Sequence, residues 1–95
     1  MTEASIVSEI IKKANRRPLC KAIKVHVGVY SLAGTPDVHI TQRGRSFWFE
    51  VKRPTRRRAV TKKQRHELDQ WNLAGAVAYV VTSWDEVQKF LDDEL

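Results

Sequence analysis

Residues 34–52 have the sequence GTPDVHITQRGRSFWFEVK, in which runs of alternating apolar and polar residues flank Gly44. Alternation with a period of two predicts two half-buried antiparallel strands. If Arg43 and Gly44 form a two-residue loop, with Gly44 supplying the positive φ that such a loop needs, the pairing register is fixed. On one face this register collects Val38, Ile40, Phe47 and Phe49. The stretch therefore predicts a hairpin with one buried face, and with His39 against Trp48 on the other.

The same register places two acidic residues, Asp37 and Glu50, directly opposite each other. Facing side chains on an antiparallel pair have Cβ atoms roughly 4.5–5.5 Å apart, and like charges in that position destabilise the sheet. A divalent cation such as magnesium would offset the repulsion, because hard ions bind carboxylate oxygens. Lys52 lies two residues beyond Glu50, hence on the same face, where its ammonium group can reach a phosphate. These residue types together point to phosphodiester hydrolysis.

The pattern of Pro36-Asp37 followed by Glu50-Val51-Lys52 resembles the PD-(D/E)XK nucleases, and the surrounding sequence is similar to their compact VRR-NUC branch. Further matching residues are Glu3, Ile6, Ile10, Gly28, Gly34, Arg53-Pro54 and Thr61-Lys62-Lys63-Gln64. The order helix, three strands, helix, strand, helix predicts an α+β domain with a mixed sheet. This order, α-β-β-β-α-β-α, agrees with the restriction-endonuclease-like core that the resemblance implies.

The resemblance also implies a role for each residue of the motif. The expected ligands of one or two Mg²⁺ (or Mn²⁺) ions are Asp37, Glu50, the carbonyl of Val51 and, directly or through water, Glu3. Lys52 would orient the attacking water and stabilise the phosphate in the transition state. Members of the family point a glutamine toward this site, and Gln64 occupies that position. The alternative for Gln64 is a capping box with Thr61.

Two acids compete for the place of the helix carboxylate. Apolar residues recur at helical spacing over Thr2–Asn15, so a first amphipathic helix is expected there. Glu3 falls within its apolar stripe, whereas Glu9 falls well off the centre. Without the resemblance, Glu3 has an equally good interpretation as a first-turn acid that the helix dipole stabilises. The resemblance favours Glu3 as the residue near the metal, and Glu9 is the reserve candidate.

Four further elements follow from local patterns. They are a strand over Lys21–Tyr30 that Gly28 interrupts, a helix over Thr61–Leu73 that Gly75 ends, a buried strand over Ala76–Thr82, and a helix from the capping-box pair Ser83 and Glu86 to about Leu91. Gly28 marks a bulge or a close backbone approach, and the resemblance implies a bend there. Between them, residues 53–60 are expected to form an exposed loop. The sequence thus predicts a single domain over residues 1–95.

The formal net charge of +6 favours an anionic partner. Seven of the thirteen residues from Arg53 to Arg65 are basic, directly after the proposed site. They are Arg53, Arg56, Arg57, Arg58, Lys62, Lys63 and Arg65. We expect these side chains to contact phosphates, and the alternative is a solvated charged loop.

Several classes of protein are disfavoured by composition. Cys20 is the single cysteine, so no intramolecular disulfide can form. His26, His39 and His66 share no ligand spacing, which argues against zinc, although His39 could touch a substrate. No apolar run approaches the ~20 residues of a membrane span, and the start lacks the apolar core of a signal peptide. An intracellular protein without a membrane partner is expected.

The expected function is that of a magnesium-dependent DNA nuclease, endo- or exonucleolytic. By analogy with the resembled family, it would act as a homodimer on four-way (Holliday) junctions or flaps. The principal alternative is a basic nucleic-acid-binding module on the same scaffold without catalysis. A ribosome-associated structural protein is a third candidate, but that class gives no reason for Glu50 and Lys52.

Overall fold

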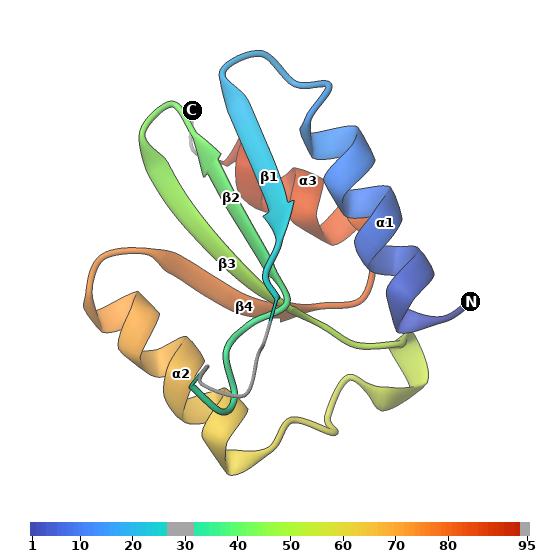
Figure 1. Ribbon diagram of the computed structural model, residues 1–95, viewed down its shortest axis with the longest axis vertical. Helices are drawn as coiled ribbons and strands as arrows, with labels where there is room; N and C mark the ends of the chain where they lie inside the picture. Colours follow the sequence, from blue (N-terminus) through green and yellow to red (C-terminus); the bar gives the residue numbers. More distant parts are fainter. Residues whose placement is uncertain (27–31, 94–95) are drawn as a thin grey trace.

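The hairpin of residues 38–51 forms the middle of a four-stranded sheet in the computed structural model, which describes residues 1–26 and 32–93 (Figure 1). The elements in chain order are α1 (Glu3–Ala14), β1 (Cys20–Lys24), β2 (Val38–Gln42), β3 (Arg45–Val51), the 3₁₀ turn η1 (Pro54–Arg56), α2 (Lys62–Leu73), β4 (Val77–Val81) and α3 (Trp84–Asp92). The predicted fold class and element order are therefore confirmed.

The register of the β2–β3 hairpin is the predicted one. Val38 faces Phe49, and His39 faces Trp48 with the two rings stacked at 4.2 Å between centroids. The loop residues Arg43 and Gly44 have φ values of 51° and 82°. Two positive φ angles match the right-handed twist of the flanking strands, so Arg43 also adopts the left-handed conformation that was expected for Gly44 alone.

The strand order is β1-β2-β3-β4, with antiparallel neighbours except for the parallel pair of β3 and β4. A parallel pair needs a crossover connection, and α2 provides it. As a result, Glu50 near the end of β3 lies beside Val80 near the end of β4. The β4 strand forms one edge of the sheet.

The two faces of the sheet are covered differently. The main core lies between the sheet and the helices α1 and α3, around the buried residues Ile10, Phe47, Phe49 and Leu91. The other face carries α2, whose one buried residue is Leu68 (Figure 1). Beside Leu68, Trp71 stacks on Trp48 with ring centroids 4.1 Å apart. The polar face of the hairpin is thus the face toward α2.

The ends of α1 and α2 are fixed by polar side chains, of which the sequence predicted only Thr61. Thr2 and Thr61 cap the two helices, each in a reciprocal capping box. At the opposite ends, Asn15 binds both backbone groups of Ala22 at 2.8 and 3.0 Å. Asn72 does the same to Ala78 at 2.9 and 2.7 Å. Each amide therefore joins a helix to the strand that follows it.

The prediction for the first strand was wrong in its extent. β1 covers Cys20–Lys24, so Val25 and His26 are not part of it, and residues 27–30 of the predicted strand, Gly28 among them, lie outside the described residues. The side chain of Ile23 is 48% exposed, while Ala22 is buried. Ile23 is exposed because α2 packs on β3 and β4 and leaves β1 uncovered on that face. In the described part of the chain, no helix is long and apolar enough to cross a membrane.

Candidate active site

The structure brings the motif residues together at the end of β3. Glu50 and Lys52 project from the face toward α2, and the Lys52 Nζ lies 3.7 Å from the Glu50 Oε2. Both side chains are largely withdrawn from solvent, at 4% and 12% exposure. Asp37 directly precedes β2, and its Oδ2 accepts a hydrogen bond of 2.8 Å from the Val51 backbone N–H. That bond attaches the first carboxylate to the strand carrying the second.

Glu50 is the most perturbed acid of the site. Burial, and then the adjacent Asp37 carboxyl, raise the pKa of Glu50 to about 8, against the lowering effect of the Lys52 charge. The protonated form of Glu50 can share its proton with Asp37, whereas two ionised carboxylates repel each other. The repulsion that the hairpin register predicted is therefore present in the folded chain.

Gln64 makes the contacts that both interpretations of the sequence require. Its Oε1 accepts a hydrogen bond from the Thr61 backbone N–H at 3.0 Å, which completes the capping box. Its Nε2 donates to the Glu50 Oε2 at 3.4 Å. One amide thus closes the first turn of α2 and ties that turn to the buried carboxylate.

Gly34 sets how closely α2 approaches the site. A Cβ atom at this position would lie 2.6 Å from the Lys63 carbonyl group and 2.9 Å from the Gln64 backbone nitrogen. Its φ of +87° is also one that side-chain-bearing residues rarely adopt. The loop before Asp37 and the first turn of α2 are therefore in direct backbone contact, which only glycine permits.

The two candidate helix acids lie in different surroundings. Glu3 is half-buried in the first turn of α1, and its charge contributes to the raised pKa of Glu50. Glu9 is exposed and lies 3.9 Å from Lys13, one turn along the same helix. Of the two acids, Glu3 is thus the one whose charge acts on Glu50.

A divalent cation fits the residues that are present. The Glu50 Oε1 is buried and has no hydrogen-bond partner among the described residues, so one oxygen of this carboxylate has its bonding capacity unused. Adjacent carboxylates of this kind are the donor set that hard cations prefer. Across residues 1–26 and 32–93, no three His, Cys, Asp or Glu side chains lie close enough to form a metal cluster. Glu3 thus does not lie within ligand distance together with Asp37 and Glu50.

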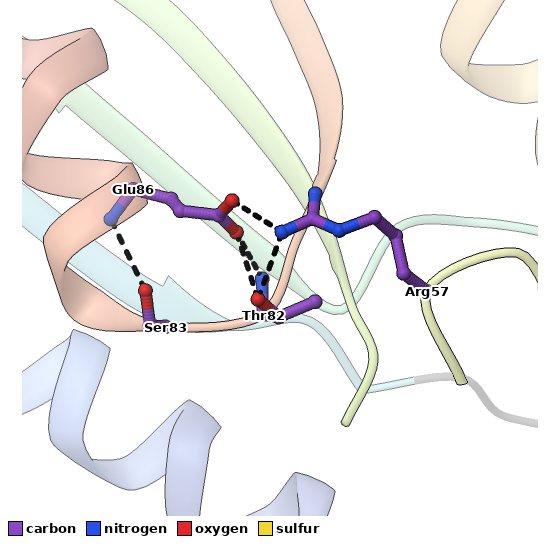
Figure 2. Close-up of polar contacts among 4 residues, drawn as sticks. All are labelled: Arg57, Thr82, Ser83 and Glu86. Atoms are coloured by element: carbon purple, nitrogen blue, oxygen red, sulfur yellow. Dashed lines mark hydrogen bonds and ion pairs between the residues drawn. The ribbon is translucent and has the colours of Figure 1, made fainter. Parts of the chain in front are cut away.

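The predicted phosphate-binding residues divide into two groups. All seven are exposed and lie on the loop after β3 or on the first turn of α2. Arg57 differs from the others because its guanidinium donates to the Thr82 Oγ1 at 3.0 Å and forms an ion pair with Glu86 (Figure 2). Arg57 therefore fastens the basic loop to the junction of β4 and α3.

Glu86 is held by more bonds than its sequence pattern predicted. Ser83 caps α3 and accepts from the Glu86 backbone N–H at 3.3 Å, as expected. The Glu86 side chain turns instead to Thr82 and accepts from its backbone N–H at 2.6 Å and its hydroxyl at 3.0 Å (Figure 2). Burial alone would raise the pKa of Glu86, but these bonds and Arg57 outweigh it and lower the pKa. We call Arg57, Thr82 and Glu86 the clamp.

The clamp and Gly34 are the features that sequence reasoning missed or left without a role. Arg57 and Glu86 are separated by 29 residues, so no local pattern signals their contact. For Gly34, the resemblance marked the position but did not indicate the close approach to α2.

Comparisons with known proteins agree with this geometry. No family model matches the sequence, and no curated protein matches it. Among solved structures, one described as "VRR_NUC domain protein" has a TM-score of 0.78 at 17% identity, covering 97% of this chain and 86% of that one. Another, described as "VRR_NUC domain", has a TM-score of 0.68 at 25% identity and covers 97% of both chains. The chain folds as a VRR-NUC domain. Its candidate active site is accordingly that of a nuclease-like domain.

Proposed function

We propose that this VRR-NUC domain is a metal-dependent nuclease that hydrolyses phosphodiester bonds in DNA. The observation that carries the proposal is the buried Glu50 carboxyl, which has one oxygen without a partner among the described residues and the other beside both Lys52 and Gln64. A protein that only bound nucleic acid would gain nothing from this arrangement, because facing Glu50 with Asp37 destabilises the sheet.

Each clustered side chain has a chemical task. Asp37, Glu50 and the Val51 carbonyl would hold one or two Mg²⁺ or Mn²⁺ ions, with Glu3 acting through water. When bound, such an ion neutralises charge that develops on the phosphate. The Lys52 ammonium, which is mostly buried, orients the attacking water and donates to the phosphate oxygens as their charge increases.

Gln64 keeps this constellation in place. Its amide bonds the Glu50 Oε2, the same oxygen that Lys52 approaches, and so fixes the rotamer of the carboxylate. Because the first turn of α2 rests on Gly34, a displacement of the helix would move Gln64 and the loop before Asp37 together. Gln64 is thus a positioning residue.

The DNA substrate and the assembly are the finer parts of the proposal. The chain carries a formal charge of +6, and its exposed basic residues follow the site directly. We infer that the substrate is a branched DNA, either a four-way junction or a flap. We also infer that a homodimer with two active sites cuts it. Two-fold symmetry of the protein would match paired incisions on a symmetric junction.

The test offers labelled linear, flap and four-way-junction DNA to the purified protein in magnesium and in chelator. Magnesium-dependent products from branched DNA are expected, and product lengths separate endonucleolytic from exonucleolytic action. Sedimentation at micromolar concentration tests the dimer. An 11.0 kDa species that cuts junctions efficiently would overturn the dimer and favour a flap.

The alternative class is a nucleic-acid-binding module without catalysis. It predicts that the protein holds DNA equally well in magnesium and in chelator and cuts in neither. The surface charge is compatible with such a module, but the unused oxygen of Glu50 has no role in it.

A further inference from the structure

A groove follows the free edge of β4, next to the candidate active site. Its larger part is a hollow of about 780 Å³ between the basic loop, the outer side of α2 and the edge of the sheet. Thr61, which hydrogen-bonds Gln64, lines this hollow. So does Val80, the sheet neighbour of Glu50. A chain leaving the site past the first turn of α2 would enter the groove.

The charged residues that line the hollow are mainly cationic. Arg58, Lys62 and Arg65 are exposed and belong to it, and Asp69 is the one acid among its lining residues in the described part of the chain. Arg57 also lines it, but its guanidinium is occupied by Glu86 and Thr82 (Figure 2). Arg57 therefore serves as a fixed wall, while the other three cations can contact phosphates.

An aromatic ring stands within this basic groove. Tyr79 is 47% exposed and separates the larger hollow from a second one of about 370 Å³ farther along the strand. Its ring is stacked on Phe90, with centroids 4.9 Å apart and planes inclined at 20°. A ring held in this way is an oriented surface on which an unpaired base can stack, whereas bases inside a duplex are already stacked on each other.

We propose that this groove binds an unpaired DNA strand that continues from the site. Arg58, Lys62 and Arg65 contact its phosphates, and a base stacks at Tyr79. Alternating phosphate and base contacts need both charge and an exposed ring, and the groove offers both along one sheet edge. The inference rests on the proposed function, because it gives the form of DNA that the site receives. It favours substrates with a single-stranded arm over fully paired ones.

Binding of a fluorescent oligothymidylate of about ten nucleotides, measured by anisotropy in chelator, tests the ring without requiring cleavage. Tyr79→Leu removes the ring, and Tyr79→Phe keeps both the ring and its stacking on Phe90. We expect Tyr79→Leu to raise the Kd by about 5- to 150-fold, the range for removal of one base stack, and Tyr79→Phe to leave it within about twofold. Equal Kd values for wild type and a folded Tyr79→Leu would overturn the proposal.

The charges are tested by salt dependence. Arg65→Ala should reduce the slope of log K against log salt by about 0.7 on the same probe, and Lys12→Ala on α1 is the charge-matched control. This pair decides the matter if Tyr79→Leu does not fold. An Arg65→Ala slope equal to that of the control would refute the phosphate contact. A second protein copy covering this edge would make both substitutions silent, which also contradicts the proposal.

Cleavage assays keep this inference separate from the proposed function. If flap DNA is cut and neither Tyr79→Leu nor Arg65→Ala changes probe binding, the groove assignment fails while the nuclease proposal stands. If probe binding depends on both residues but no DNA is cut in magnesium, the groove stands and the nuclease proposal fails.

Discussion

Glu50 and Glu86 lie near the ends of two neighbouring parallel strands, yet their surroundings are opposite. Glu50 has a buried oxygen without a partner among the described residues and a pKa raised to about 8 by burial and by Asp37. Glu86 accepts bonds from Thr82 and Arg57 that lower its pKa in spite of burial. At adjacent strand ends, the charged form of one carboxylate is disfavoured, and the charged form of the other is stabilised by hydrogen bonds and an ion pair.

The difference shows where this small domain accepts a cost in stability. A buried carboxyl beside a second acid lowers the free energy of unfolding when both are ionised, and groups perturbed in this way cluster at functional sites. The clamp contributes in the opposite sense by joining the basic loop to α3. The end of β3 thus carries a carboxylate whose charged form is disfavoured, whereas the end of β4 holds the basic loop in place.

The largest effect is expected at Lys52. Lys52→Ala should reduce turnover by about 10²- to 10³-fold, because the variant has no donor to the developing charge. DNA affinity measured in chelator should stay near that of wild type. Single-turnover cleavage measures the reduction, with Lys21→Ala on the exposed side of β1 as a control. Wild-type turnover in Lys52→Ala would remove this residue from the chemistry.

Glu50→Gln sharpens the contrast through its pH dependence. The pKa of Glu50 in the folded protein, about 8, exceeds its ordinary value of 4.5. The stability that the protonated group contributes is therefore fully present below pH 4.5 and is lost as pH rises through 8. In chelator at about pH 8.5, the free energy of unfolding of the variant should exceed that of wild type by an amount on the order of 2 kcal/mol. This is less than the full pKa shift implies, because the substitution also weakens the contacts with Lys52 and Gln64. Thermal unfolding from about pH 5 to 9 measures this.

Magnesium provides the control for that experiment. It should raise the melting temperature of wild type at about pH 8.5 more than that of Glu50→Gln, since the ion favours the charged carboxylate. A variant that melts below wild type in chelator at about pH 8.5 would mean that Asp37 and Glu50 do not repel each other as described.

The sequence predicted the β2–β3 hairpin correctly and the elements around it less completely. The two-residue loop fixed the hairpin register, and with it the meeting of Asp37 and Glu50 and the stacking of His39 on Trp48. The cap Thr61 was likewise visible, because capping depends on residues only three apart. Local geometry is what a sequence pattern encodes.

Features that depend on distant parts of the chain could not be predicted in the same way. Ile23 is half-exposed because α2 covers β3 and β4 rather than β1, and helix placement is a tertiary outcome. Arg57 seemed equivalent to Arg56 and Arg58 in the sequence. Its contact with Glu86 arises only when β4 has been placed beside β3.

A third prediction separates Arg57 from Arg58. Arg57→Ala should lower the free energy of unfolding by about 1 kcal/mol, a value reduced by solvent screening because both partners of the ion pair are partly exposed. Arg58→Ala should change it by less than about 0.5 kcal/mol. Urea unfolding of the two variants measures the difference, and equal stabilities would show that the clamp adds nothing.

The smallest effects concern DNA affinity. Neutralising Arg56 and Arg58 together should reduce the salt slope on duplex DNA by about 0.9 for each phosphate that the variant no longer binds, with little change in turnover at saturating substrate. Adding Arg57→Ala should leave the slope unchanged, because that guanidinium is already bonded. An unaltered slope in the double variant would mean that residues 56–58 belong to a solvated loop that does not contact phosphates.

The crossover through α2 also determines when the site can come into being during folding. A hairpin closed by two residues forms rapidly, while a parallel pair must wait for its connecting helix. Asp37 and Glu50 therefore meet early, and Gln64 reaches them only when α2 and β4 dock. A chain in which α2 has not yet docked would have both carboxylates side by side without the amide of Gln64 that contacts Glu50, so the complete arrangement depends on the crossover helix.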